Sequence, residues 1–267
     1  MKTVSIFGAT SGVGQLIAKQ AVEINYAVNA ISRNEASARN FENLNGCRFL
    51  QCDARDPSSI PAAALSVDQI VITIGTTAFP TAKWEGDKNT PKIACLDSVE
   101  NVLDAIDSLP KSKRPRRVTL ISSIGVECST SFPFVILNRY GVLDYKLQSE
   151  LLVIERAAKG GYEDVVVRPG RLVGEPFTNL DLAKLLKLDQ GSKRGILLDR
   201  EDVLAGDMER NDVATAVVKL FETRLDAGQK SLLFSIINKP GPRPTDAQWE
   251  ALLRDVQVPN YDDRVML

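Results

Sequence analysis

The stretch VSIFGATSGVGQLIAKQ, residues 4–20, decides the fold. Its β-branched and aromatic start predicts a strand that ends at Phe7, and the apolar spacing after the glycines predicts a helix. Glycines 8, 12 and 14 stand between the two, as in turns that bring backbone N–H groups and a helix N-terminus against a pyrophosphate. The alternative is an ordinary tight turn between a strand and a helix. The predicted pyrophosphate site consists of Gly8, Thr10, Ser11, Gly12, Val13 and Gly14.

Short apolar strands alternate with longer helical segments along the rest of the chain, which is typical of a parallel sheet with helices on both faces. The alternation from residue 3 to about residue 168 predicts a doubly wound α/β domain, a Rossmann fold with strand order 3-2-1-4-5-6. One domain of residues 1–267 is expected, in which residues 171–267 add a small C-terminal lobe. The predicted strands are TVSIFG, AVNAIS, CRFLQC, QIVITIG, RRVTLIS, EDVVVRP and SLLFSII, and helices are expected near 12–25, 92–108, 141–159, 211–223 and 246–256.

The end of the second predicted strand bears on which dinucleotide binds. NAD-binding proteins place an acidic residue there, which accepts a hydrogen bond from the ribose 2′-hydroxyl, whereas this chain has Ser32 and Arg33. A guanidinium can hold a 2′-phosphate through two parallel N–H groups, so NADP(H) is predicted in preference to NAD(H). The alternative is that Arg33 is a solvated surface side chain.

The third predicted strand is followed by Asp53 and Ala54 at the same edge of the sheet. The Asp53 carboxylate could accept a hydrogen bond from the adenine amino group, and the backbone of Ala54 could do the same. The alternative for Asp53 is a structural turn residue. The pair Asp56-Pro57 predicts the start of a helical turn capped by the aspartate.

Composition excludes several kinds of chemistry. The 267 residues include no histidine, which removes His-dependent triads and His-ligated metals, and no metal site is predicted. A formal net charge of −1 gives no reason to expect a nucleic-acid partner. Four scattered cysteines without a CxxC pair predict free thiols in a reducing compartment. No apolar run is long enough for a transmembrane segment and the chain opens directly into a strand, so we expect a soluble protein of the cytoplasm, or of an organelle after removal of a transit peptide.

Together these motifs resemble the short-chain dehydrogenase/reductase superfamily and, within it, the atypical NmrA-like branch. The likeness runs from about residue 3 to residue 236. It implies that Gly75 and Thr76, in the loop after the fourth strand, cover the cofactor, and that Pro169 and Gly170 form the turn near the nicotinamide. The matching segments are GATSGVG, CDARDP, ITIGTT at 72–77, LISSIG at 120–125, Lys146 with Glu150, VVRPGRL at 166–172 and RNDVATAV at 210–217.

The resemblance also implies where the chemistry would take place. The family's strand-end serine corresponds to Ser122 or Ser123, and its helical lysine, which holds ribose hydroxyls, corresponds to Lys146. The family's catalytic tyrosine would stand one turn before that lysine, where this chain has Val142. Valine cannot donate a proton, so a reductase here would protonate its product through water or a substrate group. The alternative for Lys146 is a solvated side chain paired with Glu150.

Two tyrosines flank the valine position, but neither has the spacing of a catalytic acid. Tyr145 lies about 100° round the helix from Lys146, and Tyr140 precedes the helix. Both are expected to pack with their hydroxyls in water.

Two apolar stretches, TTAFPTAKW and STSFPFVILNRYG, follow the fourth and fifth strands at the edge where substrate and nicotinamide would meet. Their side chains could line a pocket for a bulky apolar molecule, present an apolar patch to a protein partner, or pack inward. The residues concerned are Phe79, Trp84, Phe132, Phe134 and Ile136.

Two further segments are expected to be structural. The basic run KSKRPRR, residues 111–117, predicts a solvated loop at the edge opposite the cofactor, with a docking patch for an acidic partner or anionic lipid as the alternative. The segment DMERNDVATAVVKLFET predicts a helix capped by the asparagine or aspartate at 211–212, with Arg210 and Asp212 tying the lobe to the sheet.

The sequence therefore predicts an NADPH-dependent reductase of a bulky apolar substrate that lacks the usual tyrosine. The second hypothesis is a non-catalytic NADP(H)-binding redox sensor or assembly factor, of the kind known in the atypical branch.

Overall fold

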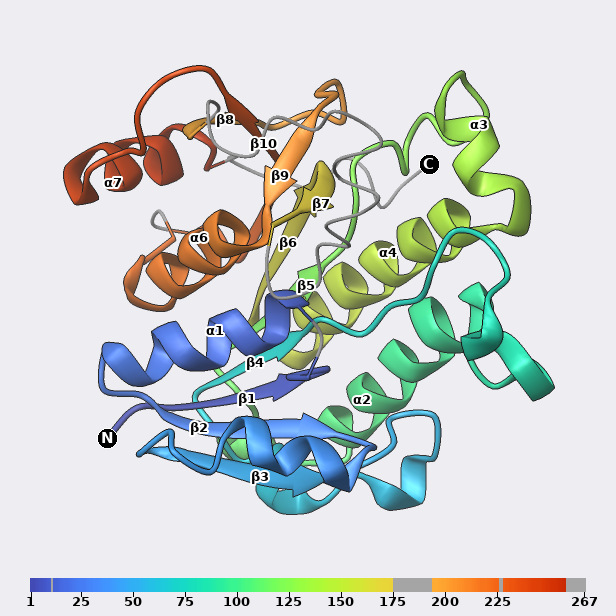
Figure 1. Ribbon diagram of the computed structural model, residues 1–267. Helices are drawn as coiled ribbons and strands as arrows, with labels where there is room; N and C mark the ends of the chain where they lie inside the picture. Colours follow the sequence, from blue (N-terminus) through green and yellow to red (C-terminus); the bar gives the residue numbers. More distant parts are fainter. Residues whose placement is uncertain (11, 175–193, 226–227, 258–267) are drawn as a thin grey trace.

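A central eight-stranded sheet organises the chain (Figure 1). The computed structural model describes residues 1–10, 12–174, 194–225 and 228–257. The strands lie in the order β3-β2-β1-β4-β5-β6-β10-β8. Their bounds are β1 Thr3–Phe7, β2 Ala27–Ser32, β3 Cys47–Gln51, β4 Gln69–Ile72, β5 Arg117–Ile121, β6 Glu163–Pro169, β8 Gly195–Asp199 and β10 Ser231–Lys239.

The first six strands are parallel and follow the predicted order 3-2-1-4-5-6. Phe7, the last residue of β1, is in register with Ile31 of β2 and with Ile72 of β4, so the carboxyl ends of these strands meet at one edge. In open sheets of this kind, ligands bind outside that edge where the strand order reverses, which here is between β1 and β4. The predicted doubly wound α/β fold is confirmed.

Helices cover both faces of the sheet (Figure 1). One layer consists of α1 and α6, with α7 packed against α6, and the opposite layer consists of α2 and α4. Ile6 of β1 lies in the core under the first layer and Phe7 in the core under the second, because successive side chains of a strand point to opposite faces. The helices are α1 Gly12–Glu23, α2 Ser98–Asp107, α4 Val142–Gly160, α6 Arg210–Glu222 and α7 Asp246–Asp255, with a π-helical turn at Lys92–Asp97 before α2.

The residues after position 170 extend the sheet. β10 pairs with β6 in parallel, and β8 pairs with β10 in the antiparallel direction. A separate two-stranded sheet is formed by β7 (Arg171–Val173) and β9 (Asp207–Glu209). Residues after position 170 thus continue the central sheet through β10 and β8.

Helix α6 begins one residue before the predicted cap, so the cap at 211–212 is wrong. The residue before the helix is Glu209, which provides no side-chain cap. Asp212 is directed inward instead of capping the helix. Its carboxylate accepts a hydrogen bond from Nδ2 of Asn238 on β10, at 2.9 Å, and forms an ion pair with Arg243 at 3.0 Å. Asp212 therefore ties the helix to the sheet, as expected. The other predicted cap is confirmed, since Asp56 accepts from the backbone N–H of Ser58 at 3.0 Å.

The basic run at 111–117 is largely a set of structural anchors. Arg117 is fully buried, and its guanidinium bonds Glu163 and the backbone carbonyls of Leu220 and Thr223. Arg114 donates to three backbone carbonyls in the same way. The expectation of a solvated loop is therefore wrong for these arginines, because Arg117 joins the end of α6 to the sheet and Arg114 joins the end of α2 to the end of α4.

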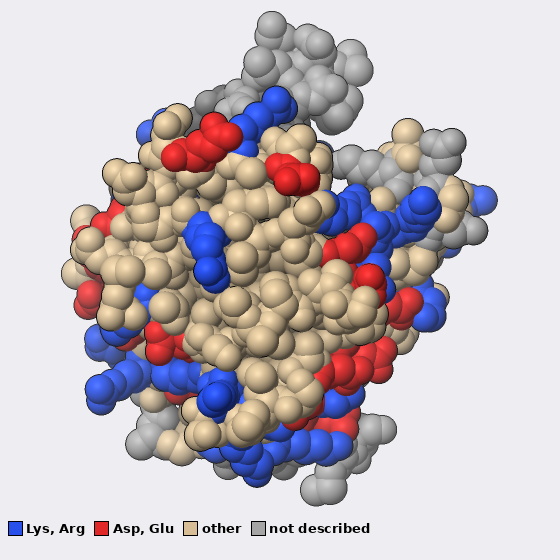
Figure 2. All heavy atoms as spheres, turned by 90° about the horizontal axis from the view of Figure 1, so that it is seen from below, with Lys and Arg blue, Asp and Glu red and all other residues tan. Residues whose placement is uncertain are grey.

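Charges of both signs are interspersed on the face seen in Figure 2, mostly around its margin. Such mixing fits the net charge of −1. Among the described residues, no helix combines the length and apolar character needed to cross a bilayer. Cys47, Cys52, Cys95 and Cys128 are free thiols.

Candidate cofactor site

A cavity of about 760 Å³ opens at the carboxyl ends of the parallel strands. Its volume is within the range of small-molecule and cofactor sites, roughly 300–1,000 Å³. The wall contains nearly all of the predicted site residues. They are Gly8, Thr10, Gly12, Val13, Ser32, Arg33, Asp53, Ala54, Gly75, Thr76, Ser122, Ser123, Lys146, Pro169 and Gly170. Gly14 lies beneath the loop instead, and Ser11 is outside the described residues.

The glycine loop has the close packing that a phosphate cradle requires. Gly8 has a positive φ of 86°, which side-chain-bearing residues rarely adopt. A Cβ atom on Gly14 would lie 2.4 Å from the carbonyl oxygen of Gly8, so only glycine lets α1 approach β1 this closely. Thr73, which the sequence reading missed, fixes the turn by donating to the carbonyl oxygens of Phe7 and Gly8 at 3.0 Å. The loop and the N-terminus of α1 therefore fit a bound pyrophosphate.

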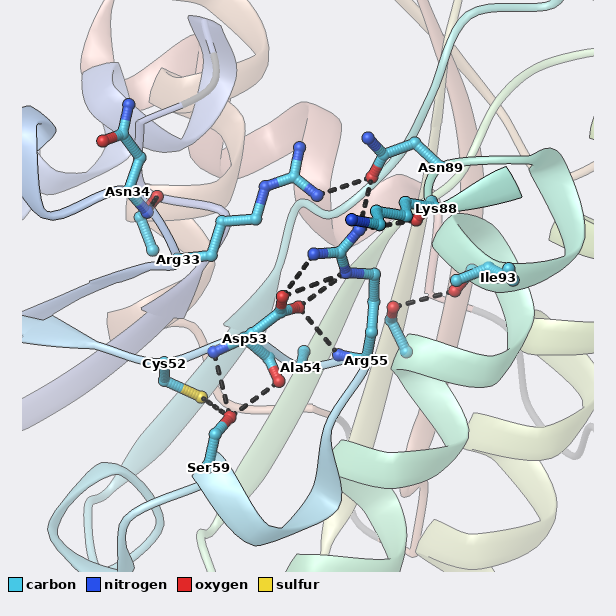
Figure 3. A network of polar contacts seen from close by, with 12 residues as sticks. Arg33, Asn34, Cys52, Asp53, Ala54, Arg55, Ser59, Lys88, Asn89 and Ile93 are labelled. Carbon is cyan, nitrogen blue, oxygen red and sulfur yellow. Dashed lines mark hydrogen bonds and ion pairs between the residues drawn. The ribbon is translucent and has the colours of Figure 1, made fainter. Parts of the chain in front are cut away.

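The hydroxyl groups of Thr10 and Ser32 lie 2.9 Å apart, which joins the glycine loop to the end of β2. Arg33 follows Ser32 and extends its guanidinium over the cavity, where Nη1 donates to Oδ1 of Asn89 at 2.5 Å (Figure 3). The prediction that Ser32 and Arg33 share one corner of the site agrees with this geometry.

Asp53 has a partner that the sequence reading did not identify. Arg55 donates to the Asp53 carboxylate through Nε, at 2.8 and 3.1 Å, through Nη2, and through its own backbone N–H (Figure 3). This guanidinium holds the pKa of Asp53 below its ordinary value. Arg55 also donates to the carbonyl oxygen of Lys88 at 2.7 Å and to Oδ1 of Asn89 at 3.4 Å. The carboxylate thus belongs to a local network at the cavity wall, and its contact with the adenine amino group stays a prediction.

The other end of the cavity contains Lys146 and the two serines. Nζ of Lys146 donates to the carbonyl oxygens of Ile121 and Ser122, at 3.3 Å each, which places the ammonium at the carboxyl end of β5. The hydroxyl of Ser123 donates to the carbonyl of Ile124, and Ser122 is buried beside the Glu150 carboxyl. The lysine and the serines are therefore neighbours, as the resemblance implies.

The alternative that Lys146 pairs with Glu150 is wrong. Glu150 forms a two-pronged ion pair with Arg168 of β6, at 3.1 and 2.6 Å, and both side chains are 1% exposed. Arg168 also pairs with Glu127 at 2.9 Å. Burial raises the pKa of Glu150, although the Arg168 guanidinium opposes this. The pair joins α4 to β6, two elements that also contribute Lys146 and Pro169 to the cavity wall, so it helps to fix where Lys146 stands.

Val142, at the expected tyrosine position, is a packing residue. It is buried in a small apolar cluster with Cys95, Val126 and Leu143, against which Phe134 packs. The tyrosines nearby do not take over its place. Tyr145 packs over Gly141, and Tyr140 is exposed.

In the described part of the chain, the apolar stretches meet the cavity only through Thr76, the first residue of TTAFPTAKW, which is part of the wall and accepts a hydrogen bond from Nε1 of Trp84 at 2.9 Å. Among the described residues, none of the five apolar side chains named from the sequence is part of its wall. Phe79 and Trp84 pack edge-on against Tyr140, with ring centroids 6.4 and 5.6 Å apart. Phe132 is 81% exposed and Ile136 is exposed as well. These positions give no support to the prediction that the apolar side chains line a substrate pocket. Phe132 and Ile136 instead agree with the alternative of an exposed apolar patch.

Two arginines beside the Pro169-Gly170 turn and at the start of α6 were missed as wall residues. Arg171 pairs with Asp207 at 2.7 Å, and Arg210 donates to the carbonyl oxygen of Gly174 at 2.7 Å. Arg171 directly follows the Pro-Gly turn, which is a signal that the sequence offered. Arg210 had been assigned only a structural role, because nothing local shows that the start of α6 faces the same cavity.

The family follows from comparison with known proteins. The model of an NAD(P)H-binding family matches residues 8–224, and the chain belongs to this family. No curated protein matches the chain. Its fold is that of short-chain dehydrogenase/reductase-type Rossmann proteins.

Several solved structures share this fold at low identity. The oxidoreductase ylbE from Lactococcus lactis has a TM-score of 0.67 at 18% identity, covering 97% of this chain and 100% of the other. ChuY, an anaerobillin reductase from Escherichia coli O157:H7, has a TM-score of 0.61 at 18% identity over 91% of this chain and 100% of its own. The yeast methylglyoxal/isovaleraldehyde reductase Gre2, complexed with NADPH, has a TM-score of 0.61 at 17% identity over 86% and 77%.

Proposed function

We propose that the protein is an NAD(P)H-dependent oxidoreductase that works as a reductase and prefers NADPH. The observation that carries the cofactor preference is the end of β2, where Ser32 replaces an acidic residue and Arg33 extends a guanidinium over the cavity. Reductases among the proteins of the same fold support the reaction class. Site residues predicted at the carboxyl ends of six strands, β1 to β6, lie in one cavity wall, which supports the same assignment.

Each part of the cavity has a role in this proposal. NADPH, when bound, supplies the hydride. The glycine loop and the N-terminus of α1 would take the pyrophosphate. An ammonium has three N–H donors, and two of those on Lys146 are directed to the carbonyls of Ile121 and Ser122, so the third is left for a hydroxyl of the nicotinamide ribose. Ser123 would orient the carboxamide or the substrate carbonyl, and the Ser122 hydroxyl, which is buried in this structure, would have to turn towards the cavity to do the same.

The source of the proton differs from that of tyrosine-dependent relatives. Val142 is buried and apolar, and among the described residues no tyrosine is part of the cavity wall. We propose that the product takes its proton from water entering the open side of the cavity, or from a group on the substrate. The only apolar side chains of the cavity wall in the described part of the chain that support a bulky apolar substrate are Leu172 and the other hydrophobic lining residues. We therefore propose only the chemical class of the substrate, a carbonyl compound or a conjugated alkene.

Titration of nicotinamide fluorescence with NADPH and NADH tests the cofactor assignment. A guanidinium bound to a phosphate contributes about 1.5–3 kcal/mol, which corresponds to roughly tenfold to hundredfold in affinity. NADPH should bind tighter than NADH by about this factor, and Arg33→Ala should remove the difference without weakening NADH. Equal affinities in the wild-type protein would refute the preference. Turnover is then followed by NADPH consumption with a panel of hydrophobic aldehydes, ketones and enones.

The second candidate is a non-catalytic NADP(H)-binding sensor or assembly factor. It is favoured by Val142 in place of the acid and by the exposed apolar side chains around α3 (Phe134–Leu137), among them Phe132 and Ile136. Tight NADPH binding together with no turnover across the panel would favour this candidate over the reductase.

A further inference from the structure

The Arg33 guanidinium is held by one of its edges only. Its Nη1 donates to Oδ1 of Asn89 at 2.5 Å, and among the described residues Nε and Nη2 make no hydrogen bond. An arginine side chain that is free to rotate loses rotamer entropy when it binds an anion. A guanidinium that is already oriented, with a free edge towards the cavity, loses less of it.

Asn89 is itself fixed by the loop after β4. Its backbone carbonyl accepts from Oγ1 of Thr76 at 2.8 Å, and the carbonyl of Lys88 before it accepts from Nη1 of Arg55 at 2.7 Å. Oδ1 of Asn89 accepts from Arg55 as well as from Arg33, at 3.4 and 2.5 Å (Figure 3). Two guanidinium donors require an oxygen at this position, so the amide orientation is determined.

Arg55 connects this loop to Asp53. Its contacts with the carboxylate leave Asp53 paired at the cavity wall. An unpaired carboxylate in this corner would repel a phosphate, and it would accept hydrogen bonds from ribose hydroxyls as the acidic residue of NAD-binding proteins does. With Arg55 in place, the formal charges of Arg33, Arg55 and Asp53 leave one net positive charge for the ligand.

We propose that Asp53, Arg55 and Asn89 form a positioning relay that sets the cofactor preference, in which Arg55 neutralises Asp53 and steadies the loop whose Asn89 aims Arg33 at the 2′-phosphate. This inference rests on the proposed function, because it assumes that the cavity binds the nucleotide. It assigns specificity to residues from three separate strand ends, of which only Arg33 touches the phosphate. Arg55 and Asn89 are positioning residues in this scheme.

The test measures binding, with no turnover required. Affinities for NADPH and NADH come from fluorescence, and those for adenosine 2′,5′-bisphosphate and 5′-AMP come from calorimetry, which isolates the phosphate corner. Asn89→Asp places a carboxylate against Arg33 and should weaken NADPH by about tenfold to hundredfold. Asn89→Ala should weaken it by roughly threefold to tenfold. NADH and 5′-AMP should change by less than about threefold in both variants, since they carry no 2′-phosphate.

Arg55→Met tests the neutralisation. NADPH should weaken about tenfold while NADH keeps or gains affinity, and the double variant Asp53→Asn with Arg55→Met should bind NADPH tighter than Arg55→Met alone. Arg48→Met, which removes the same charge from the exposed side of β3 outside the cavity, should leave both affinities unchanged. If Arg55→Met does not fold, the two Asn89 variants carry the test, because their NADPH-to-NADH ratio is insensitive to general loss of stability.

The outcomes separate the inference from the proposed function. If the wild-type protein binds neither nucleotide, or both equally, the proposed cofactor preference fails. If Arg33→Ala removes the preference but the Asn89 and Arg55 variants change NADPH and NADH by the same factor, only the relay is overturned.

Discussion

Asp164→Asn should make the protein more stable at neutral and alkaline pH. Asp164 is the second residue of β6 and is 2% exposed, and its carboxylate accepts a hydrogen bond from the Ser231 hydroxyl at 2.7 Å. Burial raises its pKa from 3.8 to about 7, although the serine bond opposes this. Asparagine has nearly the same shape and carries no charge to bury.

The size of the effect follows from the two pKa values. Each pKa unit between the folded and unfolded states is worth 1.36 kcal/mol, so the difference between 3.8 and about 7 corresponds to at most about 4 kcal/mol. Between these pH values the folded state binds more protons than the unfolded state, so the free energy of unfolding falls as pH rises. The contribution of protonated Asp164 is fully present below pH 3.8 and is lost as pH rises through about 7.

Urea unfolding of both proteins from pH 4.5 to pH 8.5 measures this difference. The variant should gain little near pH 4.5 and a few kcal/mol above pH 7. A matched control is Asp246→Asn, at the exposed start of α7, where Lys219 lowers the pKa of the carboxyl. Because its folded and unfolded pKa values both lie below this pH range, the stability difference between wild type and Asp246→Asn should stay nearly constant from pH 4.5 to pH 8.5. A stability difference between wild type and Asp164→Asn that stays constant over this pH range would refute the argument.

Three other changes are expected to separate structural from surface roles. Gly14→Ala should lower the free energy of unfolding, measured in urea, by about 1–3 kcal/mol, and it should weaken NADPH binding, because the new Cβ would lie 2.4 Å from a backbone oxygen. Gly75→Ala is the control: its Cβ meets nothing within 4 Å, so the free energy of unfolding should change by less than about 0.5 kcal/mol. Arg117→Met should lower the free energy of unfolding by about 3 kcal/mol, since it leaves buried carbonyls and a carboxylate without their donor. Lys111→Met, in the same basic run but exposed, should leave the free energy of unfolding almost unchanged in the same assay. Phe132→Ser should leave thermal stability unchanged within about 1 °C, because the side chain it removes is exposed and buries little apolar surface.

The basic run shows why composition alone misjudges a segment. Residues 111–117 have the local pattern of a solvated loop, and the positions of the two lysines agree with that pattern. The arginines differ because carbonyl groups at the ends of α4 and α6 need donors, and these ends come from residues 46 to 106 positions further along the chain. A hydrogen-bond requirement at such a separation leaves no trace in the local sequence.

The sequence by itself determined the strand order, the glycine loop and the edge at which the site lies. These depend on hydrophobic periodicity and on turn chemistry, which are local properties of the chain. Only the tertiary structure decided the partners of the site residues: Arg55 and Asn89 around Arg33, Arg168 rather than Lys146 for Glu150, and an apolar cluster around Val142. The physical reason is that a side chain's hydrogen bonds and packing are set by segments that the fold brings together from distant positions, and spacing along one helix or strand cannot specify them.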